Sequence, residues 1–512
     1  MRNKTRTLTV WLWGEEVGKL TWNTVQNLAS FKYSLEFLKG NRDIAPLTAP
    51  IASKRARLPI LGREEPKYQK LPAFLADSLP DDWGNELFER WRIKQKITGM
   101  HITPLDKLSF IGQRAMGAFE FVPDSGMKSD QQDIDLQALI ELAQRIFTAR
   151  EDAHIGADED LTWQSLIAVG TSAGGRQPKA ILAIHPETHE IRSGQIAGLE
   201  GFEYHLLKFG DAQRSSAEIE MTYYEMARLA GIDMMPSKLI EVEGKMHFLT
   251  QRFDRQNGEK LHTQTLAALY PGANSYEMLL EVCLKIRLTA KEMEEVFRRL
   301  VFNILANNTD DHDKNFTFVM NPQGQWSLAP AYDVTFIFNT GGFQPETEHC
   351  LMARGKRADW TKDDLFDFAS ENGIRMPESI IMEVVQAVTS FDTLATKYGV
   401  KEQWKSRIHR CLTEHLQAWG YESEDEQIEQ WSWDCGEHHI SHPHLEQAFK
   451  ENLDLTAEVD GKKKKYIIRQ KTEAYTEMMR HGIEQLNREA AQALIERLLL
   501  PTEAEPEEQA KQ

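Results

Sequence analysis

The spacing of apolar residues predicts a mixed chain, with short strands in its first part and helices in its second. Residues 8–22 alternate apolar and polar positions around Gly14, which is typical of a β-hairpin with one face on a core. Apolar residues recur every three or four positions at 134–150 and 217–231, the period of core-facing helices. Further short strands are predicted at 109–112, 116–122, 180–184, 204–209, 237–242 and 246–250.

From about residue 272 the helical period dominates. The clearest helix covers 289–308, where Thr289 and Glu292 have the spacing of a capping box and the apolar residues that follow form one face. More helices are predicted at 362–372, 377–398 and 401–419.

The last ninety or so residues carry weaker signals. The lysine run 462–465 follows Asp460 and Gly461 and suggests the tip of a hairpin, while 471–499 has the pattern of an amphipathic helix. The acidic tail from Thr502 has the composition of a disordered segment.

Composition excludes several classes of protein. At 512 residues the chain is long enough for about three domains. A net charge of −18 argues against extensive direct contact with nucleic acid. The four cysteines are widely spaced, and the histidine-rich stretch after Cys435 lacks the second half of a zinc spacing. Without a signal sequence or a long apolar segment, we expect a cytoplasmic protein with no membrane partner.

The polar motif at 307–316 is the strongest candidate for chemistry. Asp310 and Asn315 lie within it, and Asp333 follows after two short strands joined by a turn. A carboxylate that orients a hydroxyl, followed by an Asn and a later Asp that hold Mg²⁺, is the order of parts in a phosphoryl-transfer site. The alternative is a polar helix end whose side chains bond to their own backbone. The strand, turn, strand and carboxylate that follow favour phosphoryl transfer.

A second candidate region lies upstream. Residues 170–179 form a glycine-containing turn whose backbone N–H groups could bind phosphates, although a flexible surface turn has the same composition. Lys208, in a strand after that turn, could contact the phosphates, and Glu220 on the next helix could be its carboxylate partner. Solvated side chains are the alternative for both.

Several motifs, taken in order, make the chain resemble the HipA family of bacterial serine/threonine kinase toxins. Residues 309–316 are similar to the family motif Thr-Asp-Gly-His-x-Lys-Asn-Phe, and 331–333 to its metal-binding Tyr-Asp. Residues 252–255 resemble its hinge motif, and 74–84 resemble the signature of its N-terminal domain. The resemblance covers about residues 1–420.

The resemblance implies an α+β fold: a two-lobed, protein-kinase-like core of the PI3/4-kinase type, with an N-terminal α+β subdomain and a mainly helical C-terminal lobe and extension. The implied divisions are an N-terminal subdomain at 1–124, a kinase N-lobe with a bridging helix at 125–257, a helical catalytic lobe at 258–422, and an extension of unknown role at 423–512.

Residue roles follow from the same resemblance. Asp310 would be the catalytic base, Asn315 and Asp333 would hold Mg²⁺, and Ser172 would be the site of inactivating autophosphorylation. The residues implied to bind ATP are Gly174, Gly175, Gln177, Lys179, Lys208, Gln251, Phe253 and His312. The supporting residues are Glu220, Asp254 and Lys314. Gln251 stands where some family members have Glu, so adenine recognition through that side chain would differ.

The implied function is that of an ATP- and Mg²⁺-dependent protein serine/threonine kinase that arrests growth. Its implied partners are a protein substrate, such as an aminoacyl-tRNA synthetase, and a HipB-like helix-turn-helix antitoxin through which it would meet DNA. Two alternatives stay open: a kinase-fold corepressor that acts with the antitoxin, and a small-molecule kinase. Asp310, Asn315 and Asp333 favour catalysis over a pure binding role, but they do not separate protein from small-molecule substrates.

Overall fold

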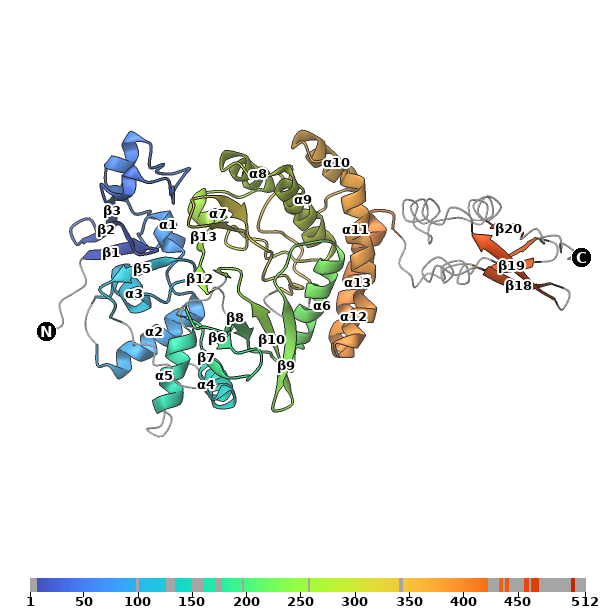
Figure 1. Ribbon diagram of the computed structural model, residues 1–512, viewed down its shortest axis with the longest axis horizontal. Coiled ribbons are helices and arrows are strands. Elements are labelled where there is room, and N and C mark those ends of the chain that lie inside the picture. The colour runs from blue at the N-terminus through green and yellow to red at the C-terminus, as the bar shows by residue number, and fades with distance from the viewer. Residues whose placement is uncertain are drawn as a thin grey trace, which may run out of the picture. The chain divides into compact units, whose positions relative to one another are not determined.

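The computed structural model describes residues 7–97, 101–125, 134–149, 160–170, 177–195, 198–256, 258–339 and 344–421, together with five short strands between 432 and 501. The chain divides into two compact units, Met1–Tyr421 and Glu422–Gln512 (Figure 1). Each unit is described separately below.

The first unit begins with a five-stranded antiparallel sheet in the order β4-β3-β2-β1-β5. The alternating residues after Thr7 form the predicted hairpin, with Leu8, Val10 and Leu12 buried on one face. The strands are β1 (Thr7–Leu12), β2 (Glu15–Asn23), β3 (Leu28–Tyr33), β4 (Ile60–Leu61) and β5 (Phe119–Val122). The helices are α1 (Ala73–Ala76), α2 (Asp82–Lys94) and α3 (Pro104–Ile111), with short 3₁₀ turns at Phe37–Lys39, Lys54–Arg57 and Pro66–Tyr68.

A second five-stranded antiparallel sheet has the order β7-β6-β8-β10-β9. Its apolar face is part of the same core as the first sheet, because Leu182, Leu207 and Leu249 pack in one cluster with Leu8 and Val10. Its strands are β6 (Lys179–Ile184), β7 (Ile191–Ser193), β8 (Glu203–Lys208), β9 (Ser237–Val242) and β10 (Lys245–Gln251). The associated helices are α4 (Leu136–Ala149), α5 (Asp160–Gly170) and α6 (Ser216–Leu229).

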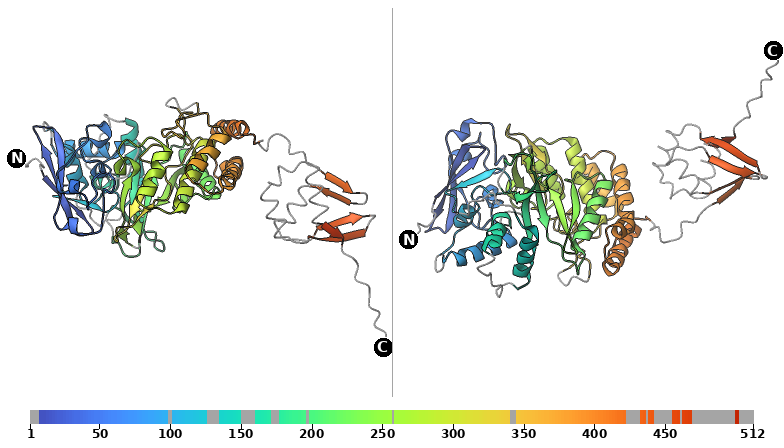
Figure 2. Two further views of the ribbon diagram at one scale, coloured as in Figure 1. Left: turned by 90° about the horizontal axis from the view of Figure 1, so that it is seen from above. Right: turned by 60° about the horizontal axis from the view of Figure 1, so that its bottom comes forward.

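The rest of the first unit is mostly helical and is built around α9. Figures 1 and 2 show most of these helices on the side of the unit away from the N-terminal sheet, whereas Leu266–Leu269 contacts Ala73–Ala76. The helices are α7 (Leu266–Leu269), α8 (Tyr276–Lys285), α9 (Ala290–Leu305), α10 (Lys362–Glu371), α11 (Pro377–Thr389), α12 (Phe391–Lys397) and α13 (Glu402–Ala418). The small strands are β11 (Arg255–Gln256), β12 (Glu259–Lys260), β13 (His262–Thr265), β14 (Thr317–Met320) and β15 (Trp326–Leu328).

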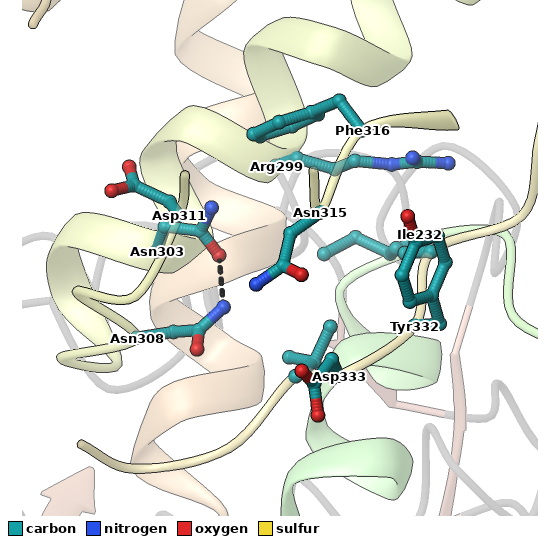
Figure 3. A pocket seen from close by; sticks show the side chains of 11 residues that line it. Ile232, Arg299, Asn303, Asn308, Asp311, Asn315, Phe316, Tyr332 and Asp333 are labelled. Atoms are coloured by element: carbon teal, nitrogen blue, oxygen red, sulfur yellow. Dashed lines mark hydrogen bonds between the residues drawn. The ribbon is translucent and has the colours of Figure 1, made fainter. Parts of the chain in front are cut away.

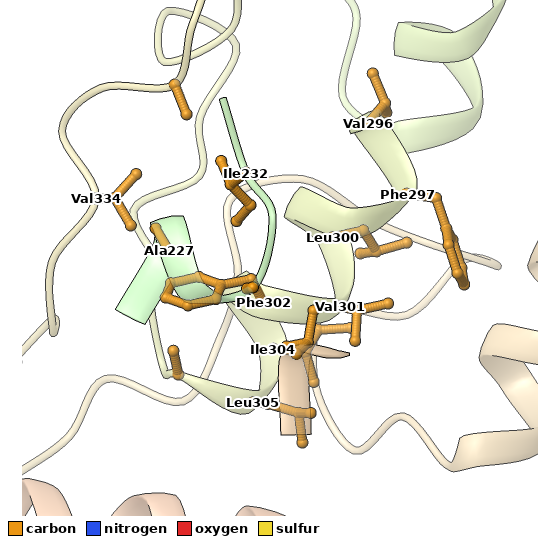
Figure 4. Close-up of a cluster of buried hydrophobic side chains, with 14 of the residues drawn as sticks. Ala227, Ile232, Val296, Phe297, Leu300, Val301, Phe302, Ile304, Leu305 and Val334 are labelled. Carbon is orange, nitrogen blue, oxygen red and sulfur yellow. The ribbon is translucent and has the colours of Figure 1, made fainter. Parts of the chain in front are cut away.

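Helix α9 begins and packs as its sequence predicts. The Thr289 and Glu292 side chains form the capping box, which satisfies backbone N–H groups that have no partner within the helix. Phe297, Leu300 and Ile304 lie on its buried face in the large C-terminal core (Figure 4). The helix ends at Leu305, which is buried in the same core. Packing in this core therefore fixes the point at which the polar motif begins.

Two secondary-structure predictions were wrong. Residues 109–112, expected as a strand, end helix α3, which Pro104 and the capping box of Thr103 and Asp106 start. A short apolar run fits either element, and the cap upstream decides for a helix. The helix predicted at 377–398 is two helices, because α11 ends at Thr389 and α12 starts at Phe391.

The second unit contributes only strands to the described part of the chain. They are β16 (Ser432–Cys435), β17 (His438–Ser441), β18 (Leu455–Val459), β19 (Lys462–Ile468) and β20 (Leu499–Pro501). The lysine run 462–465 lies in β19, antiparallel to β18, with Lys462 opposite Val459. The helix predicted at 471–499 and the tail from Thr502 lie outside the described residues, except for Leu499 to Pro501.

Candidate active site

The polar motif opens with residues that serve the fold. Asn307 has a left-handed backbone (φ 52°), which turns the chain away from α9. Its amide donates to the carbonyl of Ile337 at 3.1 Å, and the Asn308 amide donates to Asn303 Oδ1 at 2.8 Å. These two asparagines therefore hold the chain at the end of α9 through contacts with Ile337 and Asn303, not with their own backbone, and the candidate chemistry begins after them.

Asp310 extends from the motif toward solvent. Its side chain is 51% exposed, with His312 Nε2 and Cys350 Sγ each 3.8 Å from Oδ1. Partial burial raises the pKa of Asp310, and the neighbouring His312 acts in the opposite direction. The Asn315 amide donates to the Asp310 backbone carbonyl at 2.6 Å, so its own Oδ1 is left for another partner. A solvent-exposed carboxylate on a loop that is held by hydrogen bonds is suited to accepting a hydroxyl proton.

Asp333, Lys208 and Glu220 come together from three separate segments. Lys208 at the end of β8 forms an ion pair with Glu220 of α6, the carboxylate that the sequence suggested as its partner. Its Nζ also lies 2.6 Å from Asp333 Oδ1. Asp333 adopts a left-handed backbone (φ 56°), a conformation that often marks functional positions.

Electrostatics favour the charged forms of Asp333 and Lys208, whereas burial raises the pKa of Glu220 and Lys208 acts in the opposite direction. Lys208 lowers the pKa of Asp333 to about 2, despite partial burial of the carboxylate. Burial favours the neutral amine of Lys208, but Asp333 and Glu220 outweigh it and raise the pKa of Lys208 above its ordinary value. An ammonium held in this way is suited to contacting an anionic ligand.

A small cavity with a mixed polar and apolar lining lies beside the motif. In Figure 3 the Asn315 side chain points into the space between Asn308 and Asp333. Arg299 and Tyr332 line it as well. The two proposed metal ligands, Asn315 before β14 and Asp333 after β15, therefore line one cavity.

Asp311 is the residue that sequence reasoning missed. Its side chain is fully buried. Its carboxylate accepts from the Tyr276 hydroxyl at 2.7 Å, His349 Nδ1 at 3.0 Å, and the backbone N–H groups of Cys350 and Leu351 at 2.8 and 3.3 Å. It thus fixes the segment that carries Cys350 beside Asp310. In the sequence only the pairing of two acidic residues hinted at this, and nothing indicated that the second one faces inward.

The glycine-containing turn lies mostly outside the described residues, which exclude Ser172, Gly174 and Gly175. At its end, the Gln177 amide donates to the Phe209 carbonyl at 2.9 Å. Lys179 is buried, and its Cα pairs with that of Lys208 on the neighbouring strand. The structure therefore brings both predicted lysines to one end of the second sheet.

The segment 251–255 combines an accessible start with a buried charge cluster. Gln251 ends β10 with a half-buried side chain, and the Phe253 ring stacks on Tyr332 with centroids 5.6 Å apart. Asp254 is fully buried, receives two hydrogen bonds from Arg252 and one from Arg255, and accepts from the Gly117 backbone N–H at 2.8 Å.

That cluster has a structural role. Burial opposes ionisation of Asp254, but the guanidinium groups of Arg252 and Arg255 hold its pKa well below the usual range. Through Gly117 it joins the N-terminal sheet to the start of the helical part. Lys314 is exposed; its carbonyl accepts from the Tyr332 hydroxyl at 2.6 Å.

Comparison with known proteins identifies the family. The family model described as the HipA N-terminal domain matches residues 8–122, and the model described as the HipA-like C-terminal domain matches residues 171–393. The chain belongs to the HipA family. Both matched regions lie in the first unit. The region matched by the C-terminal model, residues 171–393, contains all of the candidate catalytic residues described above.

Named relatives agree with this placement. The chain is 25% identical over 400 residues to a putative kinase, Y4mE, of Sinorhizobium fredii, covering 73% of this chain and 87% of that protein. It is 21% identical over 365 residues to the serine/threonine-protein kinase toxin HipA of Shewanella oneidensis, covering 65% and 76% respectively.

A solved structure shows the fold. HipA in the Shewanella oneidensis complex of HipA, HipB and operator DNA matches with a TM-score of 0.57 and 18% identity, over 80% of this chain and 96% of that chain. The predicted two-lobed α+β kinase-like fold is therefore confirmed. In the part of the chain that the structure describes, no helix has the length and apolar character needed to cross a membrane.

Proposed function

We propose that this HipA-family protein is an ATP- and Mg²⁺-dependent protein serine/threonine kinase that acts as a growth-arresting toxin. The observation that carries the proposal is the buried contact of Lys208 with both Glu220 and Asp333, next to the loop that presents Asp310. A protein that only bound a partner would have no physical need to bury an ammonium between two carboxylates beside a reachable third one.

The residues present suit a magnesium nucleotide. Asn315 and Asp333 offer amide and carboxylate oxygens, which Mg²⁺ prefers, and Mg²⁺ commonly takes its remaining ligands from phosphates and water. Among the described residues, no three His, Cys, Asp or Glu side chains gather closely enough to hold a metal ion by themselves. That agrees with a metal that arrives with the nucleotide. Mg²⁺ would neutralise charge that develops on the transferred phosphoryl group.

The protein residues have separate roles in this proposal. Asp310 accepts the proton of the attacking hydroxyl, and Lys208 contacts the phosphates. Glu220 and Asp254 support the site, the first through Lys208 and the second by joining the N-terminal sheet to the segment that bears Phe253. The remaining nucleotide contacts are assigned to Gly174, Gly175, Gln177, Lys179, Gln251, Phe253 and His312, with Lys314 in support.

The proposal extends to partners and regulation. The substrate is a protein serine, for which an aminoacyl-tRNA synthetase is the first candidate, and a HipB-like antitoxin binds the kinase and links it to DNA. Ser172 is the proposed site of autophosphorylation. A phosphate there would add nearly two negative charges to the glycine-containing turn that is proposed to bind phosphates, which would oppose ATP binding.

Phosphate transfer from labelled ATP to the purified chain tests the proposal, with phosphosite mapping and a panel of synthetases as added substrates. We expect Mg²⁺-dependent transfer that Asp310→Asn abolishes. The matched control, Asp367→Asn, removes the same charge from an exposed helix position and should retain activity. Transfer to nothing, with antitoxin binding retained, would favour the corepressor alternative. Phosphate transfer to small molecules alone would favour the small-molecule kinase alternative.

A further inference from the structure

The start of α2 reaches the candidate nucleotide site from the N-terminal domain. Asp81 caps this helix, since one carboxylate oxygen accepts from the Gly84 backbone N–H at 2.6 Å. Its other oxygen, Oδ2, lies 3.7 Å from Lys179 Nζ, with side chains 10% and 4% exposed. Trp83, two residues further on, donates from Nε1 to the Lys179 carbonyl at 3.2 Å. The backbone and the ammonium of Lys179 are therefore both in contact with α2.

The cap alone does not explain an aspartate at this position. Asn and Ser cap helices about as well as Asp does. The Oδ2 atom of Asp81 is buried and has no hydrogen-bond partner in the described structure, and 3.7 Å is too long for such a bond. This oxygen makes only a charge contact, which is directed at Lys179.

Lys179 needs an anionic neighbour because its surroundings disfavour its charge. It is buried and lies opposite Lys208, a second ammonium, on the adjacent strand. Burial lowers the pKa of Lys179, and Asp81 opposes that shift more than Asp333 or Glu220 does. Those two carboxylates already hold Lys208. Without Asp81, Lys179 would lose the carboxylate that most favours its charged form.

We propose that Asp81 is a positioning residue, through which the N-terminal domain holds the Lys179 ammonium in place to receive the phosphates of a nucleoside triphosphate. The inference rests on the proposed function, and it makes the N-terminal domain part of the nucleotide site. Asp81 itself does not touch the nucleotide.

The test uses the full-length chain with Asp81→Asn, which keeps the helix cap and removes the charge. Binding of ATP and of adenosine is measured by calorimetry, together with KM for ATP and kcat. We expect affinity for ATP to fall roughly tenfold to a hundredfold, the range for a lost charge-assisted contact. Adenosine binding and kcat should stay close to those of the wild type, because Lys179 acts on the phosphates.

Three comparisons separate positioning from a general structural effect. Asp82→Asn removes the same charge from an exposed position in the first turn of α2 and should bind ATP normally. Lys179→Met should weaken ATP binding by itself, and adding Asp81→Asn should change it little further. Asp81→Ser, which also caps, replaces Asp81→Asn if that variant unfolds.

Two results would overturn the inference. One is an ATP affinity of the Asp81 variants equal to or above that of the wild type. The other is an equal loss of ATP and adenosine binding. Failure of the wild-type chain to bind ATP at all would refute the proposed function, and the inference with it. Normal transfer by the Asp81 variants at wild-type KM is the kinetic form of the first result and would refute the inference alone.

Discussion

Asp311 offers the sharpest test of how the candidate site is held together. Replacing it by Asn keeps the size of the side chain but exchanges one carboxylate oxygen for an NH₂ group. That group would face donors, because the carboxylate receives hydrogen bonds from Tyr276, His349 and two backbone N–H groups. One oxygen can still serve the backbone of Cys350 and Leu351.

The cost follows from those contacts. Hydrogen bonds to a charged acceptor contribute roughly 1.5–3 kcal/mol each, and buried donors left without partners add to the loss. An NH₂ group in place of Oδ2 cannot accept from the Tyr276 hydroxyl or from a protonated His349 Nδ1, so these two of the four bonds are lost in their present direction. Tyr276 keeps one contact, since its hydroxyl accepts from the Asn303 amide at 2.9 Å. We therefore expect about 3–4 kcal/mol of destabilisation, below the sum of two full bonds with both donors unsatisfied.

Two measurements check this. Denaturant unfolding of the first unit should show the loss in stability, and hydrogen exchange should show faster exchange at the amides of Cys350 and Leu351, which bond directly to the carboxylate. Asp367→Asn, an exposed charge loss on α10, serves as the control. Unchanged stability together with unchanged exchange at these two amides would refute the role given to Asp311.

Three further predictions concern the candidate site, the pH dependence of stability, and the contact between the N-terminal domain and the rest of the first unit. Lys208→Met should reduce phosphate transfer at least about a hundredfold in the labelled-ATP assay, because it removes the cation that contacts Asp333; activity within a few fold of wild type would contradict this. Burial lowers the pKa of His262 to about 3, so its contribution to stability is complete above the unfolded value near pH 6.5. That contribution falls by roughly 1.4 kcal/mol per pH unit as the pH drops from 6.5 toward 3. Between pH 7.5 and pH 5.5 the free energy of unfolding should fall less in His262→Leu than in the wild type. Equal falls would refute the lowered pKa of His262. Gly117→Ala should lower the unfolding free energy by at least about 2 kcal/mol, because a Cβ there would lie 2.5 Å from Thr263 Oγ1 on a left-handed backbone (φ +74°); a thermal midpoint equal to that of the wild type would count against this.

Local patterns predicted the elements that carry the site. The capping box of Thr289 and Glu292 and the apolar face that follows define α9 from its sequence, because both signals act within one helix. The same holds for the strands β6, β8, β9 and β10. Where a signal was short, as at 109–112, the sequence could not choose between a strand and the end of a helix.

The candidate site was predictable only in part. The spacing in 307–316 and the later Asp333 indicated phosphoryl transfer, and Glu220 was found as a possible partner of Lys208. The inward turn of Asp311 was not predictable, because its four partners come from α8 and from the segment 349–351. The contact between Asp81 and Lys179 was equally hidden, since nearly a hundred residues separate them.

The sequence by itself determined the period of each element, the order of the motifs and the residue types available for chemistry, since these depend on neighbours along the chain. Tertiary structure decided which charges lose their water and which partner each then receives. Asp310 and Asp311 are adjacent in the sequence, yet one faces solvent and the other is buried among four donors. Packing between distant segments sets this difference, because it leaves Asp310 exposed as a candidate base and buries Asp311 as a structural support.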